Sequence, residues 1–378
     1  MILDDKHSRF RTEVKDFADK EVAPRAKELD INDEFPWDLI KRMAELDLLA
    51  IYVPEKYGGT GLDTLSYIIA VEEIGRVCGS TGIFLAAHSS LGIYPIYIAG
   101  TEEQKKKYLP SLCRGEKIGS FGLTEPNAGS DAAGTETTAK LINDYYVVNG
   151  TKRFITSGGV ADIIVITATK DPKMGYPGIS AFILEKGTPG FSRGKDEDKL
   201  GLRGSLTSEL VFEDCKIPKE NLLGKEGDGF KIFMATLDGG RISIGALALG
   251  IAQGALDASV KFVKSNTKSG RPLYKMQYIQ SMIAEMATEI EAARLLVYQS
   301  AMLKDKGMPF TKEAAMAKFY ASDIGMKVTD MAVTIHGMLG VTKEYPVERF
   351  LRDEKLMEIG EGTSEIQKIV IARKILGK

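Results

Sequence analysis

The chain has 378 residues, more than one hydrophobic core usually serves, so we expect two or three domains. Hydrophobic residues make up 44% of it, charged residues make up 27%, and the formal net charge is −2. This composition is typical of a globular protein and excludes the strongly basic surface with which proteins bind nucleic acid or acidic membranes.

The cysteines and the first residues restrict the chemistry and the compartment. Cys78, Cys113 and Cys215 lie far apart with no Cys-x-x-Cys pair, so we predict buried thiols, no metal site and no disulfide framework. The first residues lack a basic segment followed by an apolar one, and no run approaches about 18 consecutive apolar residues. We therefore expect a cytoplasmic protein that does not span a membrane.

The first third of the chain is helical in pattern and the middle third is not. Residues 10–113 show helical periodicity, notably at 13–29 and 39–49. After Gly119, short runs rich in β-branched and aromatic residues predict a small barrel or sandwich. The dipeptide Asn149-Gly150 predicts a two-residue hairpin turn. The predicted strands are 145–148, 153–156, 163–169, 179–184 and 209–212.

Helical periodicity returns beyond Gly229. Apolar residues recur at i, i+3, i+4, i+7 and i+11, at Ile279, Met282, Ile283, Met286 and Ile290. Long helices of this kind pack into a bundle. We therefore predict an α+β protein with a helical domain at 1–118, a β-barrel or β-sandwich domain at 119–228 and a helical bundle at 229–378. No Gly-x-Gly-x-x-Gly follows a predicted strand, which argues against a dinucleotide fold of the Rossmann type.

One carboxylate near the end of the chain has unusual neighbours. Glu361 lies between Gly360 and Gly362 and opens the run Glu-Gly-Thr-Ser-Glu at 361–365. Glycine neighbours bring no side chains that crowd the carboxylate, and they permit a ligand to approach closely. This environment suits a catalytic base, although a solvated glutamate in a turn between two helices has the same local pattern.

Three upstream segments add groups that could bind a ligand. Residues 122–131 are rich in hydroxyls and unhindered amides, which can hydrogen-bond a flat heterocycle or an anion, although a plain loop has a similar composition. Phe154 and Thr156, at a predicted strand end, could stack on a ring and donate to a ring nitrogen, with core packing the alternative for Phe154. Arg241 offers planar donors to an anion, or a salt bridge to Asp238.

In this order and at these separations, the four segments resemble the acyl-CoA dehydrogenase family. The resemblance runs nearly end to end and includes Tyr-Pro-Val-Glu-Arg at 345–349 and Arg352-Asp353. It implies a homotetrameric flavoprotein with FAD between the β-domain and the bundle, and electron-transferring flavoprotein as the electron acceptor. The implied reaction converts an acyl-CoA to the trans-2-enoyl-CoA, with hydride passing to flavin N5.

The resemblance also implies roles for particular residues. Glu361 is the base that removes the α-proton, and burial beside an acyl chain should raise its pKa towards neutrality. Its backbone amide and an FAD ribityl hydroxyl are the implied donors to the thioester oxygen. Flavin contacts are implied for Phe121, Leu123, Thr124, Ser130, Phe154 and Thr156, and adenosine contacts for Thr363 and Glu365. Substrate contacts are implied for Ser130, Asp238, Arg241 and Gly362.

Two absences indicate the kind of acyl chain. Isovaleryl-like members carry the base immediately before the helix arginine, where this chain has Gly240, so by this comparison Glu361 is the remaining candidate. Glutaryl-CoA members need an arginine that pairs with the distal carboxylate, and its nearest counterpart here is Gly82. We therefore expect a neutral acyl chain and a short-chain, butyryl-CoA type of enzyme.

Several positions depart from the family pattern at the adenosine pyrophosphate. Asn266 and Ser269 stand where an arginine and a phenylalanine of one subunit usually hold the FAD of its neighbour, and Thr334 and Met338 replace a glutamine and a glycine. Losing a charged contact to phosphate weakens binding by roughly 1.5–3 kcal/mol, unless Lys268 or Arg271 replaces it.

These departures leave three alternatives open. The chain could be a flavin-poor subunit of a heteromeric complex, which binds acyl-CoA without efficient turnover. It could act on a branched or alicyclic acyl-CoA, because Gly360 replaces the tyrosine that usually precedes the base. It could also pass electrons to oxygen, as an acyl-CoA oxidase does.

Overall fold

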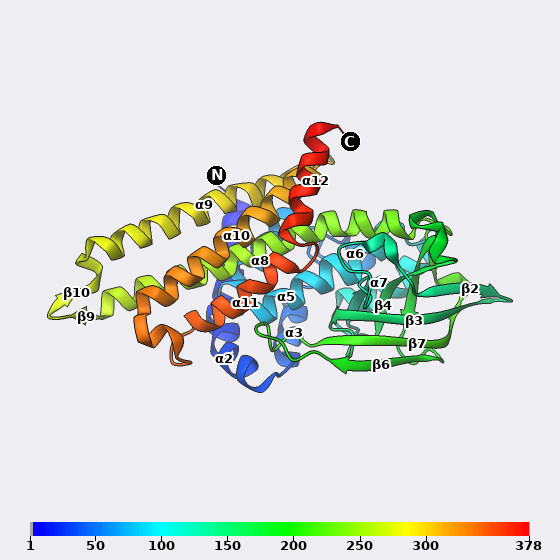
Figure 1. Ribbon diagram of the computed structural model, residues 1–378, viewed down its shortest axis with the longest axis horizontal. Helices are drawn as coiled ribbons and strands as arrows, with labels where there is room; N and C mark the ends of the chain where they lie inside the picture. Colours follow the sequence, from blue (N-terminus) through cyan, green and yellow to red (C-terminus); the bar gives the residue numbers. More distant parts are fainter. Residues whose placement is uncertain (1–2, 378) are drawn as a thin grey trace.

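A computed structural model describes residues 3–377 and shows helices, then strands, then helices (Figure 1). This confirms the predicted α+β class. Side-chain caps begin several helices of the N-terminal part: Asp63 accepts from the Ser66 amide at 2.8 Å, and Thr101 and Gln104 form a capping box. The helices are α1 (Asp5–Phe17), α2 (Ala23–Asn32), α3 (Trp37–Glu45), α4 (Thr64–Gly75), α5 (Gly79–Ala87), α6 (Tyr94–Ala99) and α7 (Glu102–Cys113).

The chain changes from helix to strand at Gly119, where β1 begins. The strand order in the sheet is β6-β7-β3-β2-β4-β5-β8, with β1 parallel to β4, and one residue pair, Thr138 with Thr169, joins β2 to β4. The strands are β1 (Gly119–Gly122), β2 (Thr138–Ile142), β3 (Tyr145–Thr156), β4 (Ile163–Thr169), β5 (Ile179–Glu185), β6 (Phe191–Asp196), β7 (Thr207–Pro218) and β8 (Leu222–Leu223).

The predicted hairpin turn at Asn149-Gly150 is wrong. β3 runs without interruption from Tyr145 to Thr156, and its register against β7 shifts between Val148 and Gly150, so the dipeptide lies at a β-bulge. The Asn149 side chain bonds across to Asp214 of β7, which holds the irregular pair together. Gly150 has φ +146°, and a Cβ there would lie 2.5 Å from Thr137 Oγ1. Glycine therefore allows Thr137 to approach the backbone of β3 closely.

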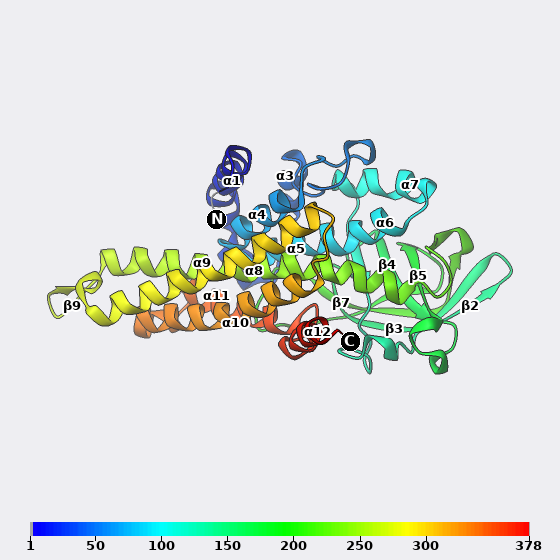
Figure 2. The ribbon, with the colours of Figure 1, turned by 90° about the horizontal axis from the view of Figure 1, so that it is seen from above.

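The third part is a helical bundle built around one long helix. Its helices are α8 (Gly229–Ser265), α9 (Gln277–Asp305), α10 (Thr311–His336), α11 (Val347–Ile359) and α12 (Ser364–Leu376), with a small hairpin of β9 (Thr267–Lys268) and β10 (Arg271–Pro272) between α8 and α9. The predicted apolar face of α9 is confirmed, because Met282, Met286 and Ile290 are buried. In both views α8 runs from the bundle to the β-domain, while the hairpin lies at the far end of the bundle (Figures 1 and 2).

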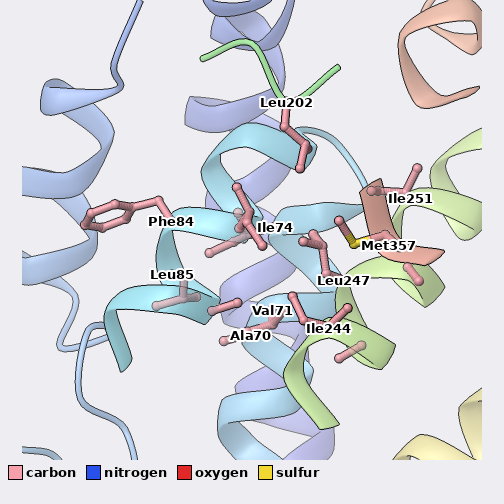
Figure 3. Packing of buried hydrophobic residues seen from close by; sticks show 14 of the residues in the cluster. Ala70, Val71, Ile74, Phe84, Leu85, Leu202, Ile244, Leu247, Ile251 and Met357 are labelled. Carbon is pink, nitrogen blue, oxygen red and sulfur yellow. The ribbon is translucent and has the colours of Figure 1, made fainter. Parts of the chain in front are cut away.

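Close helix packing in the core fixes the position of α8. Leu247 of α8 points toward Val71 and Ile74 of α4 in the hydrophobic core (Figure 3). A Cβ at Gly82 would lie 2.6 Å from Leu247 Cδ1 and 3.0 Å from the Gly75 Cα, so glycine permits this contact. The first residues of α8 are thereby held over the N-terminal helices and the β-domain.

The cysteines and the longest apolar helices belong to the interior. Cys78, Cys113 and Cys215 are free and buried, which confirms the predicted thiols. Two stretches, Gly79–Ala99 and Gly229–Ser265, are long and apolar enough to cross a membrane, but 78% of each apolar window is buried inside the protein. Their apolar character is therefore accounted for by the core.

Candidate active site

The turn between α11 and α12 presents Glu361. The backbone of Glu361 is left-handed, with φ +53°, and that of Gly362 has φ +97°. A left-handed conformation is costly for a residue with a side chain, and such strain tends to persist where the surroundings hold it for a function. Thr363 ends the turn by capping α12, because its hydroxyl accepts from the Ile366 amide at 3.4 Å.

The Glu361 carboxylate lies against α8. A Cβ atom added at Gly240 would collide with Oε2 of Glu361 and would lie 3.3 Å from Cδ2 of Leu91. Leu91 comes from a π-helical turn at His88–Ile93, a rare conformation that often occurs at functional sites. Glycine at position 240 therefore makes room on the helix for the carboxylate.

The carboxylate is poised to accept a proton near neutral pH. Its Oε2 atom is buried and has no hydrogen-bond partner among residues 3–377. Burial raises the pKa of Glu361 to about 7, while Lys318 and Arg241 oppose that rise. The Glu361 backbone amide has no acceptor within the same residues, so it is free to donate to a ligand.

Two buried side chains hold the carbonyl groups of the turn. Lys318, on α10, donates from Nζ to the Glu358 oxygen at 3.2 Å and to the Gly362 oxygen at 2.9 Å. Gln367, on α12, donates from Nε2 to the backbone oxygen of Glu361 at 3.3 Å and to that of Gly362 at 2.9 Å. Sequence reasoning missed both residues, because nothing local marks a lysine or glutamine that faces inward.

Arg241 and Asp238 form the remaining charged part of the bundle side. Arg241 donates to Asp238 at 2.5 Å, and the other Asp238 oxygen accepts from the Thr311 hydroxyl at 2.7 Å. The salt bridge to Asp238, which was the alternative prediction for Arg241, is therefore present. This salt bridge does not use every donor of the Arg241 guanidinium. The Nε atom is buried and has no hydrogen-bond partner among the described residues. One donor of Arg241 stays available to a ligand.

The β-domain residues of the predicted site form a second group. The Arg153 amide donates to the Thr124 oxygen at 2.8 Å, which joins the loop after β1 to the end of β3. Phe154 has φ +59° and is 55% exposed, and the Arg153 guanidinium lies 4.9 Å from the centroid of its ring, so the strand end presents an aromatic ring with a cation beside it. Phe121 is instead buried and stacked on Phe233, with ring centroids 4.0 Å apart, so a ligand contact would come from its backbone.

A buried ion pair that the sequence did not reveal supports this loop. Lys152 of β3 is fully buried and donates to Glu125 at 2.6 Å and to the Leu123 oxygen at 3.1 Å. Glu125 also accepts from the Glu136 amide at 2.7 Å. The loop therefore has a fixed shape, with Leu123 and Thr124 partly buried and Ser130 exposed at its end.

The positions that depart from the family pattern gather at the far end of the bundle. His336 of α10 stacks on Phe262 of α8, with ring centroids 4.2 Å apart, and this contact brings the ends of the two helices together. Asn266 follows α8 directly, and Met338, which is 83% exposed, follows α10. This end lies opposite the β-domain in both views, whereas Thr363 and Glu365 lie beside Glu361 (Figures 1 and 2).

Fold and site together define the class of the protein. Three descriptions of the acyl-CoA dehydrogenase family match the chain: the N-terminal domain over residues 4–116, the middle domain over 120–215 and the C-terminal domain over 227–376. The chain therefore belongs to the acyl-CoA dehydrogenase family, and it is an oxidoreductase that acts on acyl-CoA with FAD as its cofactor.

Individual relatives are similar over their full length. The short-chain specific acyl-CoA dehydrogenase of Clostridium acetobutylicum is 54% identical over 365 residues, 97% of this chain and 96% of the relative. The structure of butyryl-CoA dehydrogenase from Megasphaera elsdenii has a TM-score of 0.97 and 49% identity, covering 100% of this chain and 99% of that one. A chain solved in work on the electron transferring flavoprotein of Acidaminococcus fermentans has a TM-score of 0.98 and 52% identity, with both chains fully covered.

The residues present fit the flavin end of FAD. The exposed ring of Phe154, the Thr156 hydroxyl and the loop braced by Lys152 supply a flat face and polar groups on one surface. At the far end of the bundle no arginine stands at 266, but Lys268 and Arg271 lie directly opposite each other on β9 and β10. Cations for a diphosphate are therefore present there.

Proposed function

We propose that this chain dehydrogenates a short-chain acyl-CoA to the trans-2-enoyl-CoA, with Glu361 as the base that removes the α-proton. The observation that carries the proposal is the buried, unpartnered Oε2 of Glu361 beside Gly240, in a chain about half identical to short-chain acyl-CoA dehydrogenases. A carboxylate whose pKa is about 7 is partly ionised at neutral pH and is still basic enough to accept a proton.

Several residues of the chain contribute to removal of the α-proton, each in a different way. Glu361 takes the α-proton on Oε2, and its free amide donates to the thioester oxygen on which negative charge develops. Arg241 and Lys318 keep positive charge near the carboxylate. FAD, when bound, supplies the hydride acceptor for the β-hydrogen. The flavin end of FAD would be held by Phe154, Thr156, Leu123, Thr124, Ser130 and the Phe121 backbone. Thr363 and Glu365 would lie towards the adenosine.

The first test is the visible spectrum of the purified holoprotein before and after anaerobic addition of butyryl-CoA. The wild type should bleach. Glu361→Gln should keep the flavin colour and bind butyryl-CoA, but its bleaching should slow by about a thousandfold, because an amide cannot accept the proton. Glu291→Gln, which changes a half-exposed glutamate on α9, should bleach like the wild type.

Each outcome of this test is decisive. Unchanged bleaching of Glu361→Gln would remove Glu361 from the reaction. A wild-type flavin that does not bleach with butyryl-CoA would contradict the short-chain assignment. A colourless protein that gains no flavin when FAD is added would instead favour a flavin-poor subunit of a heteromeric complex, the candidate that Asn266, Ser269, Thr334 and Met338 support.

The acyl chain is proposed to be short and uncharged at its far end. A Cβ at position 82 already meets Leu247 and Gly75, so the core leaves no space there for an arginine that would pair with a distal carboxylate. Beside the base, a Cβ at Gly360 would lie 3.4 Å from the Leu356 oxygen, an ordinary contact, so this side is less filled. A branched acyl group is therefore the second candidate, and isobutyryl-CoA bleaching faster than butyryl-CoA would establish it.

Assembly and electron transfer are proposed on the same basis. The β9–β10 hairpin lies at the end of the bundle that is far from the β-domain, which carries Phe154 on β3, so a hairpin contact with FAD requires a second copy of the chain (Figure 1). This supports an assembly of at least two copies; we propose the homotetramer that the family resemblance implies, and sedimentation would measure it. Electron-transferring flavoprotein is the proposed acceptor, supported by the similar chain from the Acidaminococcus work. Oxygen consumption at a comparable rate would indicate an oxidase. A cytoplasmic location stays a prediction.

A further inference from the structure

The turn that carries Glu361 has backbone carbonyls which the helices leave unpaired. α11 ends at Ile359 and α12 begins at Ser364, so the oxygens of Glu358, Glu361 and Gly362 lie at the end of one helix and before the next. Two buried side chains, from different helices, satisfy all three oxygens. Buried carbonyls are costly when unpaired, so these donors stabilise one arrangement of the turn.

We propose that Lys318 and Gln367 are positioning residues that clamp the turn around Glu361, and that the positive charge of Lys318 also favours the carboxylate form of this base. The second half of the proposal rests on the proposed function of Glu361, whereas the first does not. Neither side chain need touch the substrate, because each acts on the turn from within the protein.

The clamp holds a conformation that the chain would otherwise avoid. Glu361 has φ +53°, a conformation that costs roughly 1–2 kcal/mol for a residue with a side chain. A Cβ at Gly362 would lie 2.7 Å from Nε2 of Gln367, so the glycine lets the amide reach the carbonyls. Without the donors, the turn could relax towards ordinary backbone angles and move the carboxylate away from Gly240.

Few charged groups compete for the Lys318 ammonium. The groups that face it are Glu361 in the turn, Arg241 on α8, Glu354 and Glu358 on α11, and the exposed Glu365 on α12. The Glu358 carboxylate already accepts from Lys355 at 2.5 Å. Glu354 is fully buried against Gly325, and neither of its oxygens has a partner among the described residues.

The protonation states follow from burial. Desolvation raises the pKa of Glu354 well above its usual range, which favours the neutral carboxyl and weakens its competition for the ammonium. Burial lowers the pKa of Lys318 to about 8, which still leaves it mostly charged at pH 7. The Lys318 ammonium lies 2.9 Å from the backbone oxygen of Gly362, the residue after Glu361, so its positive charge acts on the base. Because a nearby cation favours the ionised carboxylate, removing it should raise the Glu361 pKa.

Two substitutions separate the clamp from the charge. Lys318→Met removes both, while Gln367→Met removes carbonyl donors and leaves the charge in place. Lys327→Met is the matched control, because Lys327 lies on the same helix but pairs with the exposed Glu285 and the half-buried Glu289. The measurements on the holoprotein are hydrogen exchange of residues 357–367 and the pH dependence of bleaching by butyryl-CoA.

In Lys318→Met and in Gln367→Met, amide exchange within 357–367 should rise about tenfold or more over the wild type. The wild-type bleaching rate should rise with pH through an inflection near 7, where Glu361 ionises. In Lys318→Met the inflection should move up by about one pH unit, whereas in Gln367→Met it should stay in place. Lys327→Met should change neither measurement.

Unchanged exchange in both variants would overturn the clamp. An inflection that shifts equally in both, or in neither, would overturn the role of the charge. If Lys318→Met does not fold, Lys318→Gln keeps a shorter donor without the charge and gives the same test of the inflection. If the wild type does not bleach, the proposed function fails, and the exchange measurement still decides whether the two residues hold the turn.

Discussion

Gly240 decides how closely a helix can approach the Glu361 carboxylate. The backbone of α8 supplies a rigid wall, and the missing side chain at one position creates the space that the carboxylate occupies. Any larger residue there would compete with Oε2 for the same volume. The reactivity of Glu361 thus depends on a residue more than a hundred positions away in sequence.

Gly240→Ala should separate activity from stability. Alanine favours helix over glycine by about 1 kcal/mol, so the melting temperature should stay equal or rise. The new Cβ would displace the carboxylate, so the bleaching rate with butyryl-CoA should fall at least about tenfold, as a misplaced catalytic group does.

Gly239→Ala is the matched control. A Cβ at Gly239 would meet the tip of the flexible Lys304 side chain at 3.1 Å and not Glu361. Its bleaching rate should stay close to that of the wild type. Equal loss in the two variants would show that space beside the carboxylate is not what Gly240 provides.

At the scale of elements, the β9–β10 hairpin is the most informative. Lys268 and Arg271 are direct cross-strand partners and both are exposed. Like charges in that position repel each other, which weakens a hairpin unless an anion binds between them. Asn266, where the family usually has an arginine, instead donates to the Phe262 oxygen at 2.9 Å at the end of α8.

Neutralising the two cations should weaken FAD binding. In Lys268→Met with Arg271→Met, FAD affinity should fall by about ten- to a hundredfold, because contacts between charged groups and phosphate are lost. Asn266→Arg should raise it, provided that the resemblance in this stretch is correct. Fluorescence titration of apoprotein with FAD measures both.

The design of the restoring variant follows from the backbone. Ser269 has φ +50°, where a bulky residue is strained, so Asn266→Arg is better made alone than with Ser269→Phe. Lys264→Met, on the last turn of α8, is the control for a general loss of positive charge. An unchanged affinity in the double methionine variant would exclude the hairpin from the FAD site.

At the scale of the whole molecule, α11 ties the three parts of the chain together. Arg352 donates to both oxygens of Asp30 on α2, at 2.8 and 2.7 Å, and to the Leu200 oxygen before β7. The next residue, Asp353, is buried and accepts from the Leu202 amide at 2.6 Å. Burial alone would raise the pKa of Asp30, but Arg352 holds it below its usual range.

Arg352→Gln should destabilise the assembled fold. It leaves the buried Asp30 carboxylate without its cation, a change that typically costs about 3–5 kcal/mol when one partner of a buried pair is removed. The loss should appear as a lower midpoint in urea unfolding. Asp30→Asn combined with Arg352→Gln removes both charges and should recover part of the loss.

Arg42→Gln serves as the control for an ordinary surface ion pair. Its partners Glu21 and Glu45 are exposed, so its effect should stay below about 1 kcal/mol. If Arg352→Gln proved no more costly than this control, α11 would not be the link between the parts of the chain.

The sequence by itself determined the class of fold and the family. The spacing of hydrophobic residues distinguishes helices from strands. Glu361 between two glycines can also be recognised directly, because residue types are read from the sequence without knowledge of the fold. Asn149-Gly150 shows the limit, since the same dipeptide serves a hairpin or a bulge and only the pairing of β3 with β7 decides between them. The strands β1, β2 and β6 were not predicted, because they are short, rich in glycine or largely exposed.

Only the tertiary structure decided what surrounds the candidate base. Gly240, Lys318 and Gln367 come from α8, α10 and α12, and none carries a local sign of its role. The buried pair of Lys152 with Glu125 likewise depends on two segments meeting in space. Burial, pKa and hydrogen-bond pairing are properties of the packed neighbourhood, so they appear only when distant parts of the chain come together.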